Sequence, residues 1–117
     1  MKISIITITY NAAQWLERTM LSVLAQTSKD YEYIIVDGSS TDGTVDIIQR
    51  LEPQFEGRLS WHSEPDKGLY DAMNKGIRRA VGDYVWFINA GDEIYNLDTL
   101  AHMIAAATDE TDIIYGK

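Results

Sequence analysis

The sequence predicts an α/β fold, in which a mostly parallel open sheet is covered by helices on both faces in three layers. Apolar runs rich in β-branched residues alternate along the chain with segments whose apolar residues recur at helical spacing. Two of the apolar runs, 31–36 and 84–88, end in turns that contain glycine and a carboxylate. Because open α/β sheets bind ligands beyond the carboxyl ends of their strands, these turns indicate a binding site.

The first half of the chain contains two expected pairs of strand and helix. The run 3–9 is rich in isoleucine and threonine, which favour a strand, and Asn11 is expected to cap a helix over 12–24. The run 31–36 is the second expected strand, and the apolar spacing over 45–51 predicts a short helix that ends before a proline.

The second half contains three expected strands, at 59–62, 84–88 and 112–115, and two expected helices, at 68–80 and 97–107. The run 84–88 is almost entirely apolar, as is typical of a central strand in a parallel sheet. The apolar stripe that we expect to be buried on the first of these helices consists of Leu69, Ala72, Met73, Gly76, Ile77 and Ala80.

No linker, repeat or low-complexity segment interrupts this alternation, so residues 1–117 are expected to form one domain. The last expected strand, 112–115, reaches the final residues of the sequence. We therefore expect the domain to be truncated and to be the first part of a longer protein.

The chain is acidic, with 10 basic and 18 acidic residues and a formal net charge of −8. This charge argues against nucleic acids and anionic membranes as partners, and a nucleotide ligand would need local cations or a metal. The absence of cysteine excludes disulfides and thiolate metal sites and fits a reducing compartment. Since the apolar run 3–8 is too short to span a bilayer, we expect a cytoplasmic protein.

The most informative segment is 33–44, in which an apolar strand ends at Asp37 and a helix follows almost at once. Its glycines match neither the dinucleotide-binding pattern nor a phosphate loop, so binding of phosphate by the backbone alone is not favoured. Asp37 is placed to accept hydrogen bonds from a polar ligand. It is equally well placed to be a turn carboxylate that caps the next helix, a role that Ser40, Thr41 or Asp42 could also fill.

A second candidate segment, 87–93, leaves the expected strand at 84–88 and presents Asp92 and Glu93 in a turn that contains glycine. If this strand neighbours the one that ends at Asp37, the two carboxylates face one crevice. Mg²⁺ or Mn²⁺ commonly takes one or two protein carboxylates and completes its shell with water and substrate phosphate, so Asp92 could hold such an ion. The alternative is an ordinary turn residue, and Glu93 is expected to be solvated.

A third candidate segment is the polar face of the expected helix at 68–80, with Asp71, Asn74, Lys75 and Arg78 at helical spacing. Spacing alone favours a solvated face with an ion pair between Asp71 and Lys75. The location favours function, because the helix start and the preceding Lys67 lie where a cation and the helix dipole would both attract phosphate.

Together these segments resemble the family 2 glycosyltransferases, which have the nucleotide-diphospho-sugar transferase fold, also called GT-A and Rossmann-like. Ile3–Asn11 resembles the family's opening strand, Val36–Thr44 its second motif and Lys67–Gly76 its third, so the resemblance covers essentially the whole chain. Asn89–Asp92 takes the place of the Asp-x-Asp motif and retains only its last acid. The subgroup resembled most is that of bacterial exopolysaccharide and colanic-acid-like transferases.

The resemblance implies an inverting, metal-dependent transfer of a sugar from a nucleotide-diphosphate donor, with UDP expected, to a saccharide or lipid-linked acceptor in bacterial cell-surface polysaccharide biosynthesis. Tyr10 would pack on the base, Asp37 would hydrogen-bond to it, and Asp92 would hold Mn²⁺ or Mg²⁺ against the diphosphate. The residues implied in donor binding are Thr9, Tyr10, Asn11, Asp37, Ser39, Lys67, Asp71, Asn89 and Ala90. The family's catalytic base follows the metal motif, so we expect it beyond Lys117, and peripheral attachment to the inner face of the membrane is expected only of the full-length protein.

Two other functions remain open at this point. An Asp37 that ends a strand and a Lys117 that follows one are similar to features of response-regulator phosphoacceptor domains. Those domains carry paired acids after the first strand, where this chain has Thr9-Tyr10-Asn11, and their phosphoacceptor follows the third strand rather than the second. The other possibility is a nucleotide-binding fragment with no chemistry of its own.

Overall fold

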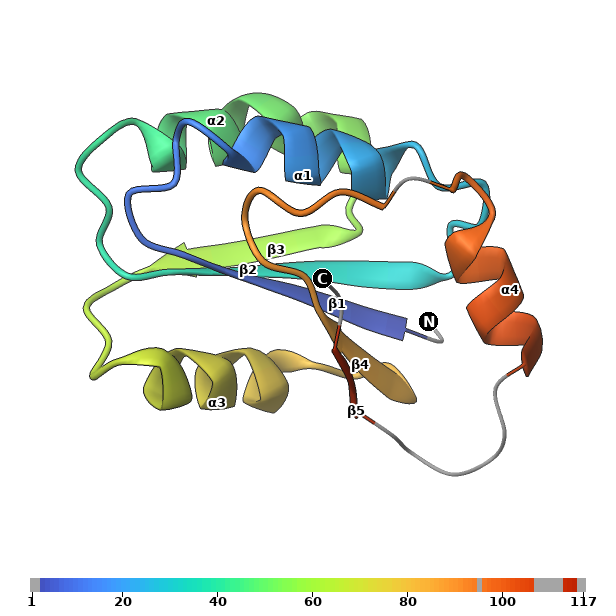
Figure 1. Ribbon diagram of the computed structural model, residues 1–117. Coiled ribbons are helices and arrows are strands. Elements are labelled where there is room, and N and C mark those ends of the chain that lie inside the picture. The colour runs from blue at the N-terminus through green and yellow to red at the C-terminus, as the bar shows by residue number, and fades with distance from the viewer. Residues whose placement is uncertain (1–2, 95, 107–112, 116–117) are drawn as a thin grey trace.

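The computed structural model describes residues 3–94, 96–106 and 113–115 and contains a sheet of five strands in the order β3-β2-β1-β4-β5 (Figure 1). Each described pair of neighbouring strands is parallel. The strands are β1 (Ile3–Thr9), β2 (Tyr31–Asp37), β3 (Leu59–Ser63), β4 (Tyr84–Phe87) and β5 (Ile113–Tyr115). The bounds of these strands agree with the predicted runs to within one residue. The agreement is close because each strand coincides with a run of β-branched and apolar residues that polar residues terminate.

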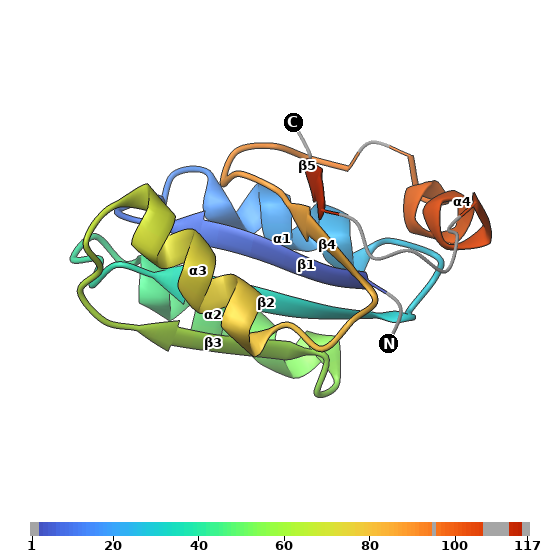
Figure 2. The same cartoon turned by 90° about the horizontal axis from the view of Figure 1, so that it is seen from below.

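Helices cover both faces of this sheet, which confirms the predicted three layers. The helices are α1 (Leu16–Leu24), α2 (Thr44–Leu51), the 3₁₀ turn η1 (Glu52–Phe55), α3 (Leu69–Arg79) and α4 (Thr99–Ala106). The helices α1 and α2 lie over one face and α3 over the other (Figures 1 and 2). No helix in the described ranges is both long and apolar enough to cross a membrane.

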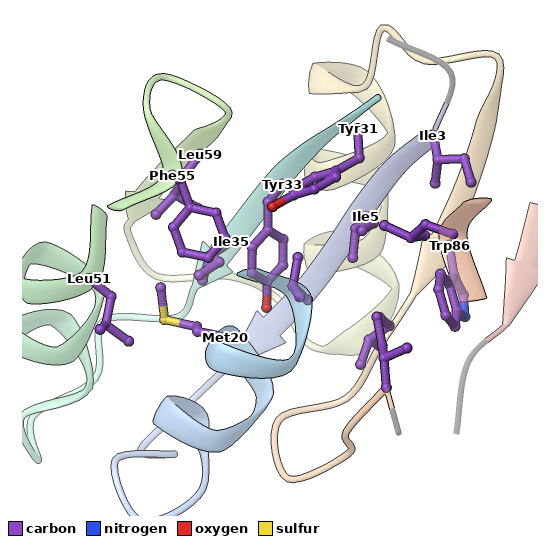
Figure 3. Close-up of a cluster of buried hydrophobic side chains, with 14 of the residues drawn as sticks. Ile3, Ile5, Met20, Tyr31, Tyr33, Ile35, Leu51, Phe55, Leu59 and Trp86 are labelled. Carbon is purple, nitrogen blue, oxygen red and sulfur yellow. The ribbon is translucent and has the colours of Figure 1, made fainter. Parts of the chain in front are cut away.

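The larger of two hydrophobic clusters fills the space between the sheet and the helices α1 and α2. In it the rings of Tyr33 and Phe55 are tilted against each other with their centroids 5.6 Å apart, beside Met20 of α1 (Figure 3). On the other face, Ile6 and other alternate strand residues pack against α3. A Cβ atom placed on Gly76 of α3 would lie 2.8 Å from Cγ2 of Ile6, so this helix approaches the sheet very closely.

The predicted apolar stripe of α3 is wrong in part. Ala72 and Gly76 are buried, but Leu69 is 65% exposed and Ile77 is 36% exposed. A helix that packs through alanine and glycine comes close to the sheet and buries only a narrow stripe, which leaves its larger apolar residues at the margins in solvent.

The predicted helix cap at Asn11 is also wrong, because α1 begins only at Leu16 and is preceded by Trp15. Asn11 instead has φ 49°, and its side-chain oxygen accepts a hydrogen bond from the backbone N–H of Thr41 at 2.8 Å. Other element ends differ by one or two residues, and residues 107 and 112 of the predicted last helix and strand lie outside the described ranges.

The sheet order places a topological switch point between β1 and β4. The chain adds β2 and β3 on one side of β1 and then crosses to β4 on the other. The strands that precede the two candidate turns, β2 and β4, are therefore not neighbours, since each pairs with β1. Both turns still border the carboxyl end of β1, where open α/β sheets bind ligands.

Candidate functional site

The loops that follow β1 and β2 are joined by hydrogen bonds at the carboxyl edge of the sheet. The backbone N–H of Asn11 donates to Oγ of Ser40 at 2.8 Å, and that of Ala13 donates to Oδ2 of Asp42 at 3.1 Å. Asn11 and Ser39 both have left-handed φ angles, 49° and 61°. Such conformations are unfavourable for residues with side chains and persist where surrounding contacts hold them, often at functional sites.

Asp37 lies at the centre of this edge and is fully buried, with 0% of its surface exposed. Its Oδ1 accepts hydrogen bonds from Oγ1 of Thr9 and from Oγ of Ser40, both at 2.6 Å. Its Oδ2 accepts from the backbone N–H of Ser40 at 2.9 Å and from Oγ of Ser63 at 2.7 Å. Burial acts to raise the pKa of Asp37, but the hydrogen bonds from Ser40, Thr9 and Ser63 outweigh it and lower the pKa below its usual value.

A carboxylate has about four acceptor positions, and in Asp37 the protein itself fills all of them. These bonds show that Asp37 holds the turn together, as the turn-carboxylate alternative requires, and its contact with a ligand stays a prediction. Ser63, which sequence reasoning missed, pairs with Asp37 in the register of β2 and β3. Ser63 could have been predicted from the parallel register of β2 and β3, which places it opposite Asp37.

Two side chains present ligand-accessible surface beside Asp37. Tyr10 is 68% exposed, whereas the adjacent Thr9 is buried. Asp66, from the loop between β3 and α3, is half-buried and lies against Gly38. Sequence reasoning gave Asp66 no role, because the contact joins loops that are far apart in the chain.

The turn after β4 is held against α1. The backbone N–H of Asp92 donates to the carbonyl of Asn89 at 3.0 Å, and Gly91, with φ 103°, donates its N–H to Oγ1 of Thr19 at 2.7 Å. Asn89 is exposed, Ala90 is half-buried against the larger hydrophobic cluster, and Asp92 is half-buried. The turn therefore presents Asp92 from a fixed backbone.

No group of three or more histidine or acidic side chains within the described residues could hold a metal by itself. Asp92 nevertheless fits a Mg²⁺ or Mn²⁺ ion that arrives with a diphosphate, because such ions need only one or two protein carboxylates. The oxygen donor chemistry is suitable, and the remaining ligands would be phosphate and water oxygens.

The start of α3 has the ion pair that spacing predicted. Nζ of Lys75 lies 3.4 Å from Oδ2 of Asp71 and 3.3 Å from Oε1 of Glu64. Oδ2 of Asp71 also accepts the backbone N–H of Lys67 at 2.8 Å, a hydrogen bond that lowers the pKa of Asp71. The side chain of Lys67 is exposed, so it can reach a ligand at this edge.

Residues 4–117 match the family described as Glycosyl transferase family 2. A PGL/p-HBAD biosynthesis glycosyltransferase of Mycobacterium bovis BCG is 41% identical over 115 residues, which are 97% of this chain and 45% of that protein. An uncharacterized glycosyltransferase of Mycobacterium tuberculosis is 42% identical over 105 residues, which are 89% of this chain and 39% of that protein. The chain thus spans under half the length of these relatives.

Solved structures show the same fold. TarS 1-349 of S. aureus in complex with UDP-GlcNAc superposes with a TM-score of 0.82 at 28% identity, over 90% of this chain and 30% of that one. The mannosyltransferase PcManGT of Pyrobaculum calidifontis, in complex with GDP-Man and Mn²⁺, has a TM-score of 0.81 at 29% identity, over 88% and 31% of the two chains. The α/β sheet is thus of the GT-A type, and by its sequence match over nearly its whole length the chain belongs to glycosyl transferase family 2.

Proposed function

We propose that this chain is the donor-binding part of an inverting glycosyltransferase, which moves a sugar from a UDP-sugar to a saccharide or lipid-linked acceptor in bacterial cell-surface polysaccharide biosynthesis. The observation that carries the proposal is the arrangement of side chains around the carboxyl end of β1, in a chain that belongs to glycosyl transferase family 2. There the exposed ring of Tyr10 lies on one side and the fixed turn of Asp92 on the other. The subgroup that produces exopolysaccharides is the one whose motifs the chain resembles most.

The two sides of this edge suit the two halves of a nucleotide-diphosphate donor. Tyr10 offers an aromatic face for the base, while Asp92 and the exposed Lys67 offer a metal ligand and a cation for the diphosphate. A Mn²⁺ or Mg²⁺ ion held by Asp92 would neutralise charge that develops on the departing nucleoside diphosphate. Among the similar structures, TarS has been solved with UDP-GlcNAc and PcManGT with GDP-Man and Mn²⁺, which supports a donor and a metal of these kinds.

The response-regulator alternative loses its support. In the doubly wound fold of such phosphoacceptor domains, the first strand lies between the second and third. In this chain β1 lies between β2 and β4. The match to glycosyl transferase family 2 is consistent with this difference in strand order.

Calorimetry tests the proposal. UDP should bind in the presence of Mn²⁺, and Tyr10→Ala should weaken uridine and UDP alike, because stacking of a base on an aromatic ring contributes roughly 1–3 kcal/mol. Glu56→Gln is the control, since Glu56 is exposed and precedes β3 at the opposite edge of the sheet. Absence of binding of any nucleoside diphosphate at millimolar concentration would refute the donor-binding function of this chain.

A further inference from the structure

Three polar side chains recur at helical spacing along α1 and just past its end: Thr19, Ser22 and Gln26. Thr19 and Gln26 are completely buried, and Ser22 is half-buried. Burial of a polar side chain costs free energy unless hydrogen bonds compensate for it. The hydrogen-bond partners of these side chains therefore show why polar residues lie at such positions.

Each of the three side chains accepts a hydrogen bond from a backbone N–H in the segment that leads from β4 into α4, drawn in orange in Figure 1. The N–H of Gly91 donates to Oγ1 of Thr19 at 2.7 Å, that of Ile94 to Oγ of Ser22 at 3.1 Å, and that of Leu100 to Oε1 of Gln26 at 3.0 Å. Because all three donors are backbone groups, α1 fixes the path of this segment independently of its side chains.

Asp92 lies between the first two of these hydrogen bonds. The N–H of Gly91, directly before it, and the N–H of Ile94, two residues after it, both donate to hydroxyls of α1. Among the described residues, none donates a hydrogen bond to the carboxylate of Asp92, which is half-buried. The backbone of the turn therefore sets the position of this carboxylate, and α1 fixes that backbone on both sides of it.

The helix α1 also connects the two sides of the candidate site. The backbone N–H of Leu16, its first residue, donates to the carbonyl of Ala12 at 2.9 Å, in the loop that carries Tyr10. The turn that carries Asp92 is fixed to the same helix at Thr19. A shift of the turn relative to α1 thus changes the separation between the exposed ring of Tyr10 and the carboxylate of Asp92.

We propose that Thr19 is a positioning residue for Asp92, whose carboxylate it holds where a metal-bound diphosphate can reach it. This inference rests on the proposed donor-binding function. Ser22 supports Thr19, because Oγ of Ser22 donates to the carbonyl of Thr19 at 2.7 Å while it accepts the next N–H of the segment. A metal ion with one protein ligand depends strongly on the placement of that ligand, and placement before binding reduces the loss of conformational entropy.

Thr19→Val tests this role, because valine has nearly the same shape but no hydroxyl. A methyl group would replace an oxygen that lies 2.7 Å from the nitrogen of Gly91, which is too close for carbon, so the turn has to move. In calorimetry with Mn²⁺, UDP should bind roughly fivefold more weakly to this variant, as the loss of one hydrogen bond implies. The affinities of uridine, and of UDP without Mn²⁺, should not change. Thr19→Ser keeps the hydroxyl and should restore the affinity for UDP with Mn²⁺.

Thr7→Val is the matched control. Thr7 is also a completely buried threonine, and its hydroxyl lies 2.8 Å from that of Tyr33 inside the sheet. The control should lose stability but keep the ratio of UDP affinities with and without Mn²⁺. Amide hydrogen exchange gives a readout that needs no ligand: the N–H of Gly91 should exchange faster in Thr19→Val and not in Thr7→Val.

Two further variants keep the test decisive. Ser22→Ala removes the acceptor of the Ile94 N–H from a half-buried position and should weaken UDP binding with Mn²⁺ in the same way, even where Thr19→Val does not fold. In the Asp92→Ala background, Thr19→Val should cause no further loss of UDP affinity, because both changes act through one carboxylate.

The outcomes separate this inference from the function on which it rests. An unchanged Mn²⁺ dependence of UDP binding in both Thr19→Val and Ser22→Ala, an equal loss in Thr7→Val, or additive losses in the double variant would overturn the positioning role and leave donor binding intact. Failure of the unmodified chain to bind UDP would overturn both.

Discussion

Because Asp37 accepts hydrogen bonds from Thr9, Ser40 and Ser63, we predict that its replacement lowers the stability of the fold. An effect on ligand recognition would follow from this loss of stability. In Asp37→Asn the amide keeps one acceptor oxygen, so two of the four donors can retain partners and two must reorient. Loss of hydrogen bonds to a charged group, offset by relief of its burial, should lower the free energy of unfolding by about 1–3 kcal/mol. Asp37→Ala would leave Thr9, Ser40 and Ser63 without an acceptor and should cost more.

Urea unfolding followed by circular dichroism and tryptophan fluorescence measures this loss. With a denaturant slope of about 2 kcal/mol per M for a domain of this size, a loss near 2 kcal/mol lowers the midpoint by about 1 M. The control Glu56→Gln lies in an exposed turn and should change stability by less than about 0.5 kcal/mol. A midpoint for Asp37→Asn equal to that of the unmodified chain would refute the argument.

The pH dependence of the difference in urea midpoint between the unmodified chain and Asp37→Asn gives an independent check. Because folding lowers the pKa of Asp37 below its ordinary value of 3.8, the stabilisation is fully present above that pH. It is lost as the pH falls through the lower pKa of the folded state. The gap in urea midpoint between the unmodified chain and Asp37→Asn should therefore narrow below pH 3.8, and a constant gap would contradict the assignment.

Three further outcomes are expected. Asp92→Ala should remove the Mn²⁺ dependence of UDP binding and spare uridine, measured by calorimetry with and without the metal; equal losses for both ligands would contradict a separate metal subsite. Gly76→Ala would place a Cβ 2.8 Å from Ile6 and, despite its better helix propensity, should lower the urea midpoint through overpacking of about 1–3 kcal/mol. Because the chain spans under half the length of its curated relatives, residues 1–117 should bind radiolabelled UDP-sugars without efficient transfer to lipid or saccharide acceptors; robust transfer would place the catalytic base among the acids of these residues.

The layered fold could be predicted because its signals are local. Each strand is a run of β-branched or apolar residues whose ends are marked by polar turns, and the pairing of Ile3–Thr9 with Tyr31–Asp37 follows from their order in a parallel sheet. The position of the candidate site was predicted in the same way, because ligands of open α/β sheets bind beyond the carboxyl ends of the parallel strands. These inferences needed no knowledge of contacts between distant segments.

What could not be predicted depends on contacts between distant loops. Asn11 has the propensity of a helix cap, yet its side chain is taken by Thr41, 30 residues away, and the helix starts later. The hydroxyls that donate to Asp37 come from Thr9 and Ser63, which are 28 and 26 residues away in the chain, and no pattern near Asp37 predicts them. Spacing within one segment carries no information about such partners.

The three carboxylates Asp37, Asp66 and Asp92 at the carboxyl ends of the strands differ in burial, and we expect their roles to differ accordingly. The negative charge of Asp37 is stabilised by three protein hydroxyls and one N–H, and these hydrogen bonds hold the ends of β1, β2 and β3 together. Asp66 and Asp92 are only half-buried and stay on opposite sides of that framework, where each can meet a different part of a ligand. A chain with a net charge of −8 can bind a diphosphate only if these negative charges stay away from the phosphates or are bridged by a metal. Asp66 lies beside Gly38 and Tyr10, whereas Asp92 lies on the turn after β4, where a metal ion could bridge it to a diphosphate.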